Sequence, residues 1–378
     1  MKPVFRRYFS LLGAVAGLSL CSFSVSSNDI TIGGIPFKRQ VIAVAGGESA
    51  VATGDFNEDG FQDIAIANNA DTSVTIFLAT PAGQFLKTVS YAAGHDPSDI
   101  VSADINGDRK LDLVISNHDT TQVSLFLGDG SGEFTPADNS PMTIPVLPHP
   151  HIVKVLDIDG DNYEDLIVDS RDSRGLLFLK GLESNQFDLN GTIINTGGDP
   201  YMGFAIGDIN HDGVMDFAAP NSDHISVVLG AEDGTYAEPV YFPVERPFAV
   251  ELVDMNGDDN LDIVAASMTG PVTVITGDGS GAFEFDGKLE LEFPTGAKRI
   301  AVGDMNGDGI SDALISNWSS DVMVLLGGEQ GFEVTRFKPQ DIQNPWMSKL
   351  ADMNNDQKSD LIISDGAGGQ VLVYMSSQ

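Results

Sequence analysis

The chain has 378 residues, with 55 acidic side chains against 20 basic ones, which gives a formal net charge of −35. Binding to nucleic acid and to anionic lipid headgroups depends on Lys and Arg, so this composition argues against both kinds of partner. Cys21 is the only cysteine, which excludes an intramolecular disulfide.

The N-terminal residues 1–26 have the layout of a secretory signal peptide. Residues 2–7 carry three positive charges, residues 11–20 are apolar apart from Gly and one Ser, and small residues follow. This apolar stretch is too short to span a bilayer. We therefore expect an exported protein, periplasmic or secreted, without a transmembrane segment. Lipid anchoring through Cys21 is the alternative, although Leu20 is not the small residue expected before a lipidated cysteine.

Seven copies of one nine-residue pattern, Asp-x-Asn/Asp-x-Asp-x-x-x-Asp, dominate the remainder of the chain. The copies begin at residues 55, 104, 157, 208, 254, 304 and 352, so their spacings are 49, 53, 51, 46, 50 and 48 residues. A nearly constant period of this length indicates a repeat protein in which each repeat is one supersecondary unit.

Short strands are predicted around each copy of the pattern. In the second repeat, residues 100–104 lead into the loop, residues 112–116 leave it, residues 123–127 follow a polar turn, and a looser fourth segment ends near Val146. Short β-branched runs separated by Gly, Asn and Asp clusters are typical of strands and hairpins. Residues 27–378 are therefore predicted to form a single all-β domain, a seven-bladed β-propeller of four-stranded antiparallel blades.

The two ends of the chain predict how the ring closes. The last repeat stops after residues 371–375, which correspond to a third strand. Residues 37–44 match the fourth strand of the first repeat, residues 85–91, in the pattern of residues that follows each of them. We expect the N-terminal strand to complete the last blade, because this pairing removes an exposed sheet edge.

Each nine-residue loop is a candidate calcium site. Side-chain oxygens at positions 1, 3, 5 and 9 and the backbone carbonyl at position 7 suit a hard cation, above all Ca²⁺. Position 12 is apolar in every copy, which excludes an EF-hand. The alternatives are an Asx-rich turn that binds no ion and an array in which some sites are unfilled. Up to seven Ca²⁺ are predicted, with the ligands Asp55, Asn57, Asp59, Asp63, Asp104, Asn106, Asp108, Asp112, Asp157, Asp159, Asp161, Asp165, Asp208, Asn210, Asp212, Asp216, Asp254, Asn256, Asp258, Asp262, Asp304, Asn306, Asp308, Asp312, Asp352, Asn354, Asp356 and Asp360.

A family resemblance rests on these repeats. Gly-Asp-Phe/Ile/Met-Asn-x-Asp-Gly-x-x-Asp, then an aliphatic strand, then Leu-Gly-Asp-Gly-Ser-Gly-Glu-Phe resembles the FG-GAP/VCBS repeat, found in integrin α-subunit heads and in many bacterial exported proteins. The resemblance covers residues 37–375 and implies a calcium-binding propeller. It leaves the biochemical function open, because such propellers include adhesins, lectin-like binders and some enzymes.

The face opposite the acidic loops is the candidate ligand face. Sequence order sends both tryptophans and several cations to turns and crossings on that face, where Trp318, Trp346, Arg246 and Arg299 are the candidate ligand residues. Aromatic rings flanked by cations suit sugars that carry carboxylate or sulfate groups. The predicted function is a monomeric binding or cell-adhesion module for an extracellular glycan or protein.

Two other functions stay open. No Gly-x-Ser-x-Gly, His-Glu-x-x-His, P-loop or catalytic cysteine is present, which argues against an enzyme. A polysaccharide lyase-like enzyme would use His151, Tyr201 and Arg246, which lie on consecutive crossings between blades. A structural scaffold without a small ligand is the third possibility. His149 and His151 resemble a metal-binding pair, but the local sequence offers no third ligand.

Overall fold

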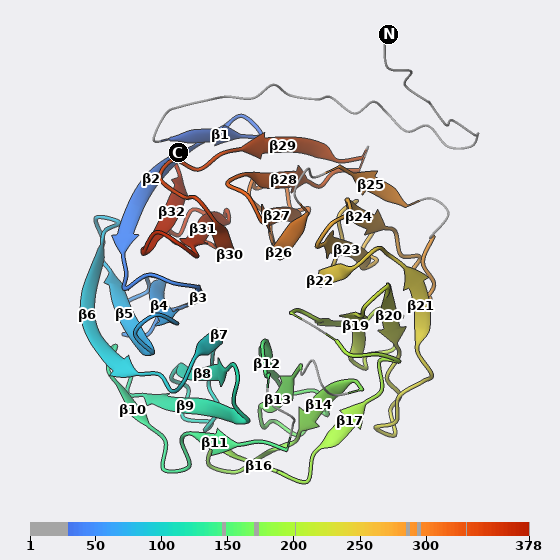
Figure 1. Ribbon diagram of the computed structural model, residues 1–378, viewed down its shortest axis with the longest axis horizontal. Coiled ribbons are helices and arrows are strands. Elements are labelled where there is room, and N and C mark those ends of the chain that lie inside the picture. The colour runs from blue at the N-terminus through green and yellow to red at the C-terminus, as the bar shows by residue number, and fades with distance from the viewer. Residues whose placement is uncertain are drawn as a thin grey trace.

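The protein is described by a computed structural model in which seven sheets are arranged as the blades of a ring (Figure 1). The described residues are 29–145, 149–169, 174–200, 202–284, 288–292, 296–329 and 331–377. Every regular element within these ranges is a strand, as the repeat pattern predicted. No helix in this part of the chain is long and apolar enough to cross a membrane. The expected signal peptide, including Cys21, lies outside the described residues.

The first four blades follow the first four repeats. Blade one contains β3 (Ser49–Gly54), β4 (Asp63–Asn68), β5 (Ser73–Ala79) and β6 (Phe85–Ala92). Blade two contains β7 (Pro97–Ala103), β8 (Asp112–Asn117) and β9 (Gln122–Gly128), with β10 (Phe134–Pro136) and β11 (Met142–Thr143) both paired to β9. Blade three contains β12 (Val153–Leu156), β13 (Asp165–Val168), β14 (Leu176–Leu179) and β17 (Thr192–Ile194), with a separate hairpin of β15 (Gly181–Leu182) and β16 (Gln186–Phe187). Blade four contains β18 (Ala205–Gly207), β19 (Asp216–Pro220), β20 (His224–Val228) and β21 (Val240–Pro243).

The last three blades repeat the same strand order. Blade five contains β22 (Pro247–Val253), β23 (Asp262–Ser267), β24 (Val272–Ile275) and β25 (Leu289–Leu291). Blade six contains β26 (Ala297–Gly303), β27 (Asp312–Asn317), β28 (Val322–Leu326) and β29 (Glu333–Phe337). Blade seven contains β30 (Pro345–Ala351), β31 (Asp360–Asp365) and β32 (Gln370–Ser376), followed outward by β2 (Ile35–Ala43) and β1 (Ile30–Ile32). The predicted seven-bladed all-β fold is therefore confirmed.

The ring closes as predicted, through the N-terminal strand. Strand β2 pairs antiparallel with β32 over seven register positions, from Phe37 opposite Ser376 to Ala43 opposite Gln370 (Figure 1). Phe37 and Ile42 are buried by this pairing, so the closing strand contributes apolar surface as well as hydrogen bonds. Strand β1 then folds back on β2 and makes blade seven five-stranded, which the sequence did not predict.

The hydrophobic core is a ring of clusters that lie between neighbouring blades. Strands such as β4 and β8 are buried along their whole length, because each faces an adjacent blade on both sides. One cluster joins Ile64 and Phe77 of blade one to Ile362 and Val373 of blade seven. Apolar contacts of this kind hold all blades in register, and they fix the position of the loops at the two ends of the ring.

Candidate functional site

Each acidic loop connects the first and second strands of its blade, so all seven loops lie on one face of the ring. The carboxylate at position 1 organises the loop, because its Oδ2 accepts the backbone N–H of position 6 in every copy, at 2.6–2.9 Å. Position 6 has a positive φ in all seven copies. This includes Arg109 at 69° and Gln357 at 66°, where a glycine would be less strained. The loop geometry is thus the same whether or not glycine is present.

The aspartate at position 9 has a structural role that the sequence pattern did not reveal. In every blade this residue is fully buried. One carboxylate oxygen accepts the N–H of loop position 2, and the other accepts an N–H at the end of the third strand, at 2.7–3.1 Å. Asp112, for example, joins Ile105 to Gly128. Burial raises the pKa of Asp112 to about 7. The position-9 carboxylate therefore fastens the loop to its own blade.

The donor atoms present in these loops fit calcium. Six loops offer three carboxylates and one amide, and the third offers four carboxylates. In the third loop, carboxylate oxygens of Asp157, Asp159 and Asp165 lie within 4.8 Å of one another. Each position-9 oxygen accepts one hydrogen bond, which leaves a lone pair for a cation. A hard divalent ion bound there would relieve the repulsion between these carboxylates.

The third loop differs from the other six because a lysine already contacts it. The Lys180 ammonium reaches Asp159 Oδ2 and lies 2.9 Å from Asp161 Oδ2. These hydrogen bonds raise the pKa of Lys180 above its ordinary value. In the other repeats the equivalent residue is uncharged: Leu78, Leu127, Leu229, Thr276, Leu326 and Met375. The loop with the most carboxylates is thus the loop that carries an internal counter-charge.

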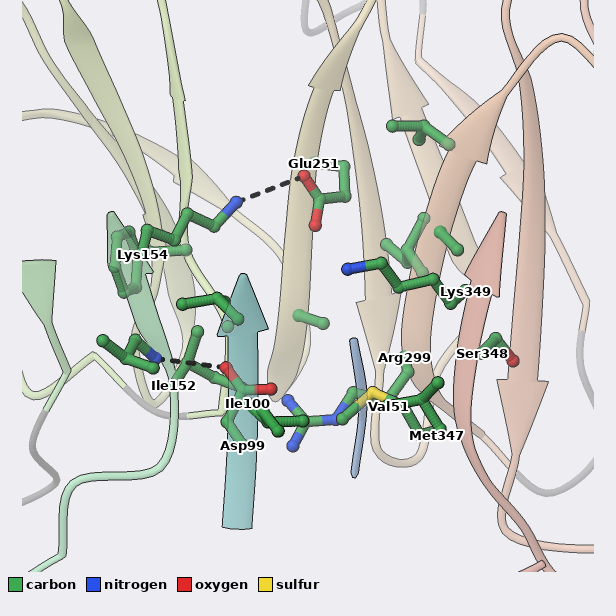
Figure 2. A pocket seen from close by; sticks show the side chains of 18 of the residues that line it. Val51, Asp99, Ile100, Ile152, Lys154, Glu251, Arg299, Met347, Ser348 and Lys349 are labelled. Atoms are coloured by element: carbon green, nitrogen blue, oxygen red, sulfur yellow. Dashed lines mark hydrogen bonds and ion pairs between the residues drawn. The ribbon is translucent and has the colours of Figure 1, made fainter. Parts of the chain in front are cut away.

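The first strands of the blades surround a central cavity of about 480 Å³. Figure 2 shows five charged side chains that line it: Asp99, Lys154, Glu251, Arg299 and Lys349. Three are cationic and two are anionic, which leaves the cavity with one more positive than negative charge. A mixed-charge cavity of this size is within the range of small-ligand sites.

Four of these charges are engaged with the protein. Lys154 Nζ lies 3.6 Å from Glu251 Oε2. Asp99 Oδ2 accepts the Val153 N–H at 3.1 Å, and Arg299 Nη1 donates to the Met202 carbonyl. Burial raises the pKa of Asp99 and of Glu251, and the nearest cations, Arg299 and Lys154 respectively, partly offset this.

Lys349 is the exception among the charges of the cavity. Its amino group extends from β30 into the cavity (Figure 2), and no described residue forms a hydrogen bond or ion pair with it. Burial lowers the pKa of Lys349, while the negative charges of Asp99 and Glu251 raise it. The cavity therefore holds a partly buried lysine that has no direct partner among the described residues.

The structure brings together only two of the four predicted ligand residues, Trp318 and Trp346. The rings of Trp318 and Trp346 meet edge to face with centroids 6.3 Å apart, and Lys298 Nζ lies 4.3 and 4.8 Å from their centroids. Arg246 belongs to blade five, where its Nη2 contacts Met268 Sδ at 3.5 Å. Arg299 lies in β26 and lines the cavity, so its expected place on a loop of the open face is wrong.

Of the three predicted lyase-like residues, the two that the structure describes lie at different blades. His151 lies between blades two and three, whereas Arg246 lies at blade five. Tyr201 lies outside the described residues. His211, within the fourth acidic loop, is directed toward the next blade, with its Nε2 3.1 Å from Asn260 Oδ1.

Sequence reasoning missed Lys154, Glu251 and Lys349, although a signal for them exists. Each stands three residues before the first aspartate of its loop, and Asp99 and Arg299 stand five residues before theirs. Alternate residues of a strand share one face, so these positions of each first strand face the cavity. A charge at either position in an otherwise apolar strand is the pattern that identifies a cavity-lining residue.

The fold and the loops define the class: a seven-bladed β-propeller with an acidic nine-residue loop in each blade. The FG-GAP-like repeat matches three stretches of the chain, residues 55–115, 104–168 and 254–315. The protein thus contains FG-GAP-like repeats, which confirms the resemblance seen in the sequence. No curated protein matches the chain as a sequence relative.

Solved structures with the same architecture are distant in sequence. The BBS1N chain, from a crystal structure of BBS1N in complex with ARL6DN, is 15% identical, with a TM-score of 0.62 over 89% of this chain and 93% of that one. Virginiamycin B lyase from Staphylococcus aureus is 13% identical, with a TM-score of 0.56 over 90% of this chain and 99% of that one. At these identities the similarity establishes the fold alone.

Proposed function

We propose that this protein is an exported, calcium-binding propeller that acts as a binding or adhesion module for an acidic extracellular glycan. The observation that carries the proposal is Lys349, a cation inside the central cavity without a hydrogen-bond or ion-pair partner among the described residues. Burying an unpaired charge is costly, and a carboxylate or sulfate group of a ligand would offset that cost. An acidic segment of an extracellular protein is the alternative ligand.

The aromatic cluster beside the cavity supports a sugar ligand. Lys298 covers one side of the Trp318–Trp346 pair, but the Trp318 side chain remains open, with 38% of its surface exposed. Trp346 and Lys349 lie on the same strand, β30, so one member of the aromatic pair and the cavity lysine are held by one element, while Trp318 follows β27 of the neighbouring blade. A sugar ring stacked on Trp318 would direct its acidic group toward the cavity.

Calcium has a stabilising role in this proposal. The acidic loops lie at the opposite ends of the first strands from Trp318 and Trp346, so their ions are not expected to touch the ligand. An ion that binds only the folded state adds RT ln(1 + [L]/Kd) to its stability. Extracellular calcium modules have Kd values on the order of 10⁻⁴ to 10⁻³ M. Chain export, which the N-terminal residues predict, would supply such concentrations. Bound calcium would then take the stabilising role that disulfides have in many exported domains.

Calorimetric titration with a polyuronate oligosaccharide tests the proposal. Lys349→Met should weaken binding at least about tenfold, the loss expected for about 1.4 kcal/mol. Lys87→Met is the matched control, because Lys87 is an exposed lysine on the outer strand β6. Trp318→Ala should also weaken binding, whereas raised salt should reduce it only modestly, because Lys349 is partly buried and salt screens such a charge less than an exposed one. Binding that is unchanged in Lys349→Met would overturn the proposal, and binding to acidic peptides alone would favour the protein ligand.

The lyase-like alternative stays a prediction without a supporting contact. It would be detected directly by the appearance of unsaturated uronate absorbance when the protein is incubated with the same oligosaccharide. The scaffold alternative predicts neither binding nor product. These two readouts, binding and product formation, separate the three candidate functions with one substrate.

A further inference from the structure

Three of the six histidines meet on the face opposite the acidic loops. His118 follows β8 in blade two, and His149 and His151 precede β12 of blade three, so neighbouring blades bring them together (Figure 1). One imidazole nitrogen from each residue can be chosen so that all three lie within 4.8 Å of one another. The ring centroids are 4.6, 4.7 and 5.8 Å apart. His118 thus adds a third imidazole to the pair of His149 and His151, which lacked one in the local sequence.

Two carboxylates contact these rings. Asp96 Oδ2 lies 3.1 Å from His118 Nδ1, where it accepts a hydrogen bond from the imidazole. The other ring nitrogen, His118 Nε2, then carries a lone pair and lies 3.0 Å from His149 Nδ1. Asp119 Oδ1 lies 3.1 Å from His149 Nδ1. A carboxylate on the far nitrogen is the usual outer partner of a metal-ligating histidine, and Asp96 has this position on His118. Asp119 instead contacts the His149 nitrogen that faces His118, so it is placed to be a ligand itself.

The backbone around the cluster is held in place. The His151 N–H donates to Asp169 Oδ1 at 2.9 Å, and its carbonyl accepts hydrogen bonds from Ser98 and Ser116. His149, Asp96 and Asp119 have positive φ angles of 103°, 57° and 55°. Such conformations are unfavourable for residues other than glycine and concentrate at functional sites. The chain therefore accepts local strain at three positions of this cluster.

We propose that His118, His149 and His151 form a second class of metal site, one that binds a transition ion of the Zn²⁺ type. Neutral imidazoles suit Zn²⁺, Co²⁺ and related ions, whereas Ca²⁺ prefers oxygen donors. In tetrahedral coordination with Zn–N distances of about 2.0–2.1 Å, neighbouring ligand nitrogens lie roughly 3.3–3.4 Å apart. The 3.0 Å between His118 Nε2 and His149 Nδ1 is close to this spacing. The fourth position is left to water or to the Asp119 carboxylate.

A simpler arrangement of the same rings is a hydrogen-bonded chain, in which one proton lies between His118 and His149. The two arrangements differ in what they predict for added metal. A hydrogen-bonded chain has no reason to bind a transition ion at a defined stoichiometry. A three-histidine site takes up one ion per chain and gives it four-coordinate geometry.

Titration of the untagged full chain with Co²⁺ in saturating CaCl₂ distinguishes them. Calcium keeps the acidic loops occupied, and the visible bands of four-coordinate cobalt report imidazole binding. We expect one equivalent of Co²⁺, displaced by one equivalent of Zn²⁺. His118→Asn and His149→Asn should each abolish the four-coordinate bands and weaken binding by more than the tenfold to hundredfold cost of losing an outer partner. Asp96→Asn should retain the bands with about tenfold to hundredfold weaker affinity.

The control is His224→Asn. His224 lies on the same face at blade four and also contacts a carboxylate, Asp223 Oδ1, at 2.7 Å, but it is not part of the cluster. This variant should bind cobalt like the unmodified chain. The inference is overturned if no stoichiometric binding occurs, or if His118→Asn and His149→Asn retain it. His151 is buried, so its variant could unfold, and the two partly exposed histidines therefore decide the outcome.

Discussion

The position-9 aspartate is expected to stabilise its blade independently of calcium, and Asp112→Ala tests this. Asp112 is fully buried, and its two oxygens accept the N–H groups of Ile105 and Gly128 at 3.1 and 2.8 Å. Alanine would leave both N–H groups buried without an acceptor, at a cost of about 1–3 kcal/mol each. We expect the free energy of unfolding to fall by about 2–6 kcal/mol, a large fraction of the stability of a typical domain.

Asp108→Ala in the same loop is the comparison that separates the two roles. Asp108 occupies position 5 and is exposed, and its carboxylate accepts only the Lys110 N–H within the loop. Its loss removes a predicted calcium ligand without disturbing the attachment of the loop to the blade. Urea denaturation should be followed for both variants in saturating calcium and in excess EGTA. If both variants lose equal stability in saturating calcium, or if Asp112→Ala is neutral in EGTA, the attachment role is refuted.

Three further predictions concern closure, calcium affinity and pH. Phe37→Ala should lower the free energy of unfolding by about 3–5 kcal/mol in urea denaturation, because Phe37 is fully buried in the closing strand. Val41→Ala on the same strand should cost under about 0.5 kcal/mol, because Val41 is 52% exposed. Equal effects of the two substitutions would refute this assignment of the strand faces. Lys180→Met should tighten calcium binding at the third loop in a calorimetric titration, since the lysine competes with the ion for two carboxylates; unchanged or weaker binding would contradict it. Burial lowers the pKa of Lys298 to about 8, from 10.5 in the unfolded chain. Between these two pH values Lys298 is protonated in the unfolded state but deprotonated in the folded state, so folding becomes more favourable as the pH rises. The stability of the unmodified chain relative to Lys298→Met should therefore rise by roughly 1–3 kcal/mol from pH 8 to 10.5, and a flat difference would show that Lys298 titrates normally.

The architecture could be predicted from the sequence because each repeat contains its own signals for strands and turns. The aspartate pattern marks the first turn of every blade, and the short apolar runs on either side of it alternate with turn residues. Closure was predictable for the same reason, since residues 37–44 resemble a fourth strand and the last repeat lacks one. A single copy of the aspartate pattern would be ambiguous, but seven copies at a nearly constant spacing identify a repeat fold.

The side chains that meet across blades were not predictable in the same way. His118 is 31 residues before His149, and only the pairing of neighbouring blades brings them within hydrogen-bond distance. Arg299 was expected on a crossing between blades, but β26 begins at Ala297 and carries Arg299 into the cavity. Strand boundaries decide which side chains face the cavity, and the sequence places such boundaries only to within a few residues.

The placement of charges follows from the two ends of the first strand in each blade. At one end, the acidic loop gathers oxygens at the rim, and position 9 ties that loop to the third strand. Along the strand, the positions three and five residues before the loop face the cavity, where Lys154, Glu251 and Lys349 stand. At the other end, crossings and turns bring together nitrogen and aromatic groups, including Trp318 and His118. The loop oxygens and the histidine nitrogens are thereby kept on opposite faces, so a hard ion in the loops and a ligand or softer ion on the other face would not compete for the same atoms. Calcium removal should consequently change binding on the far face only as far as it unfolds the blades that carry it.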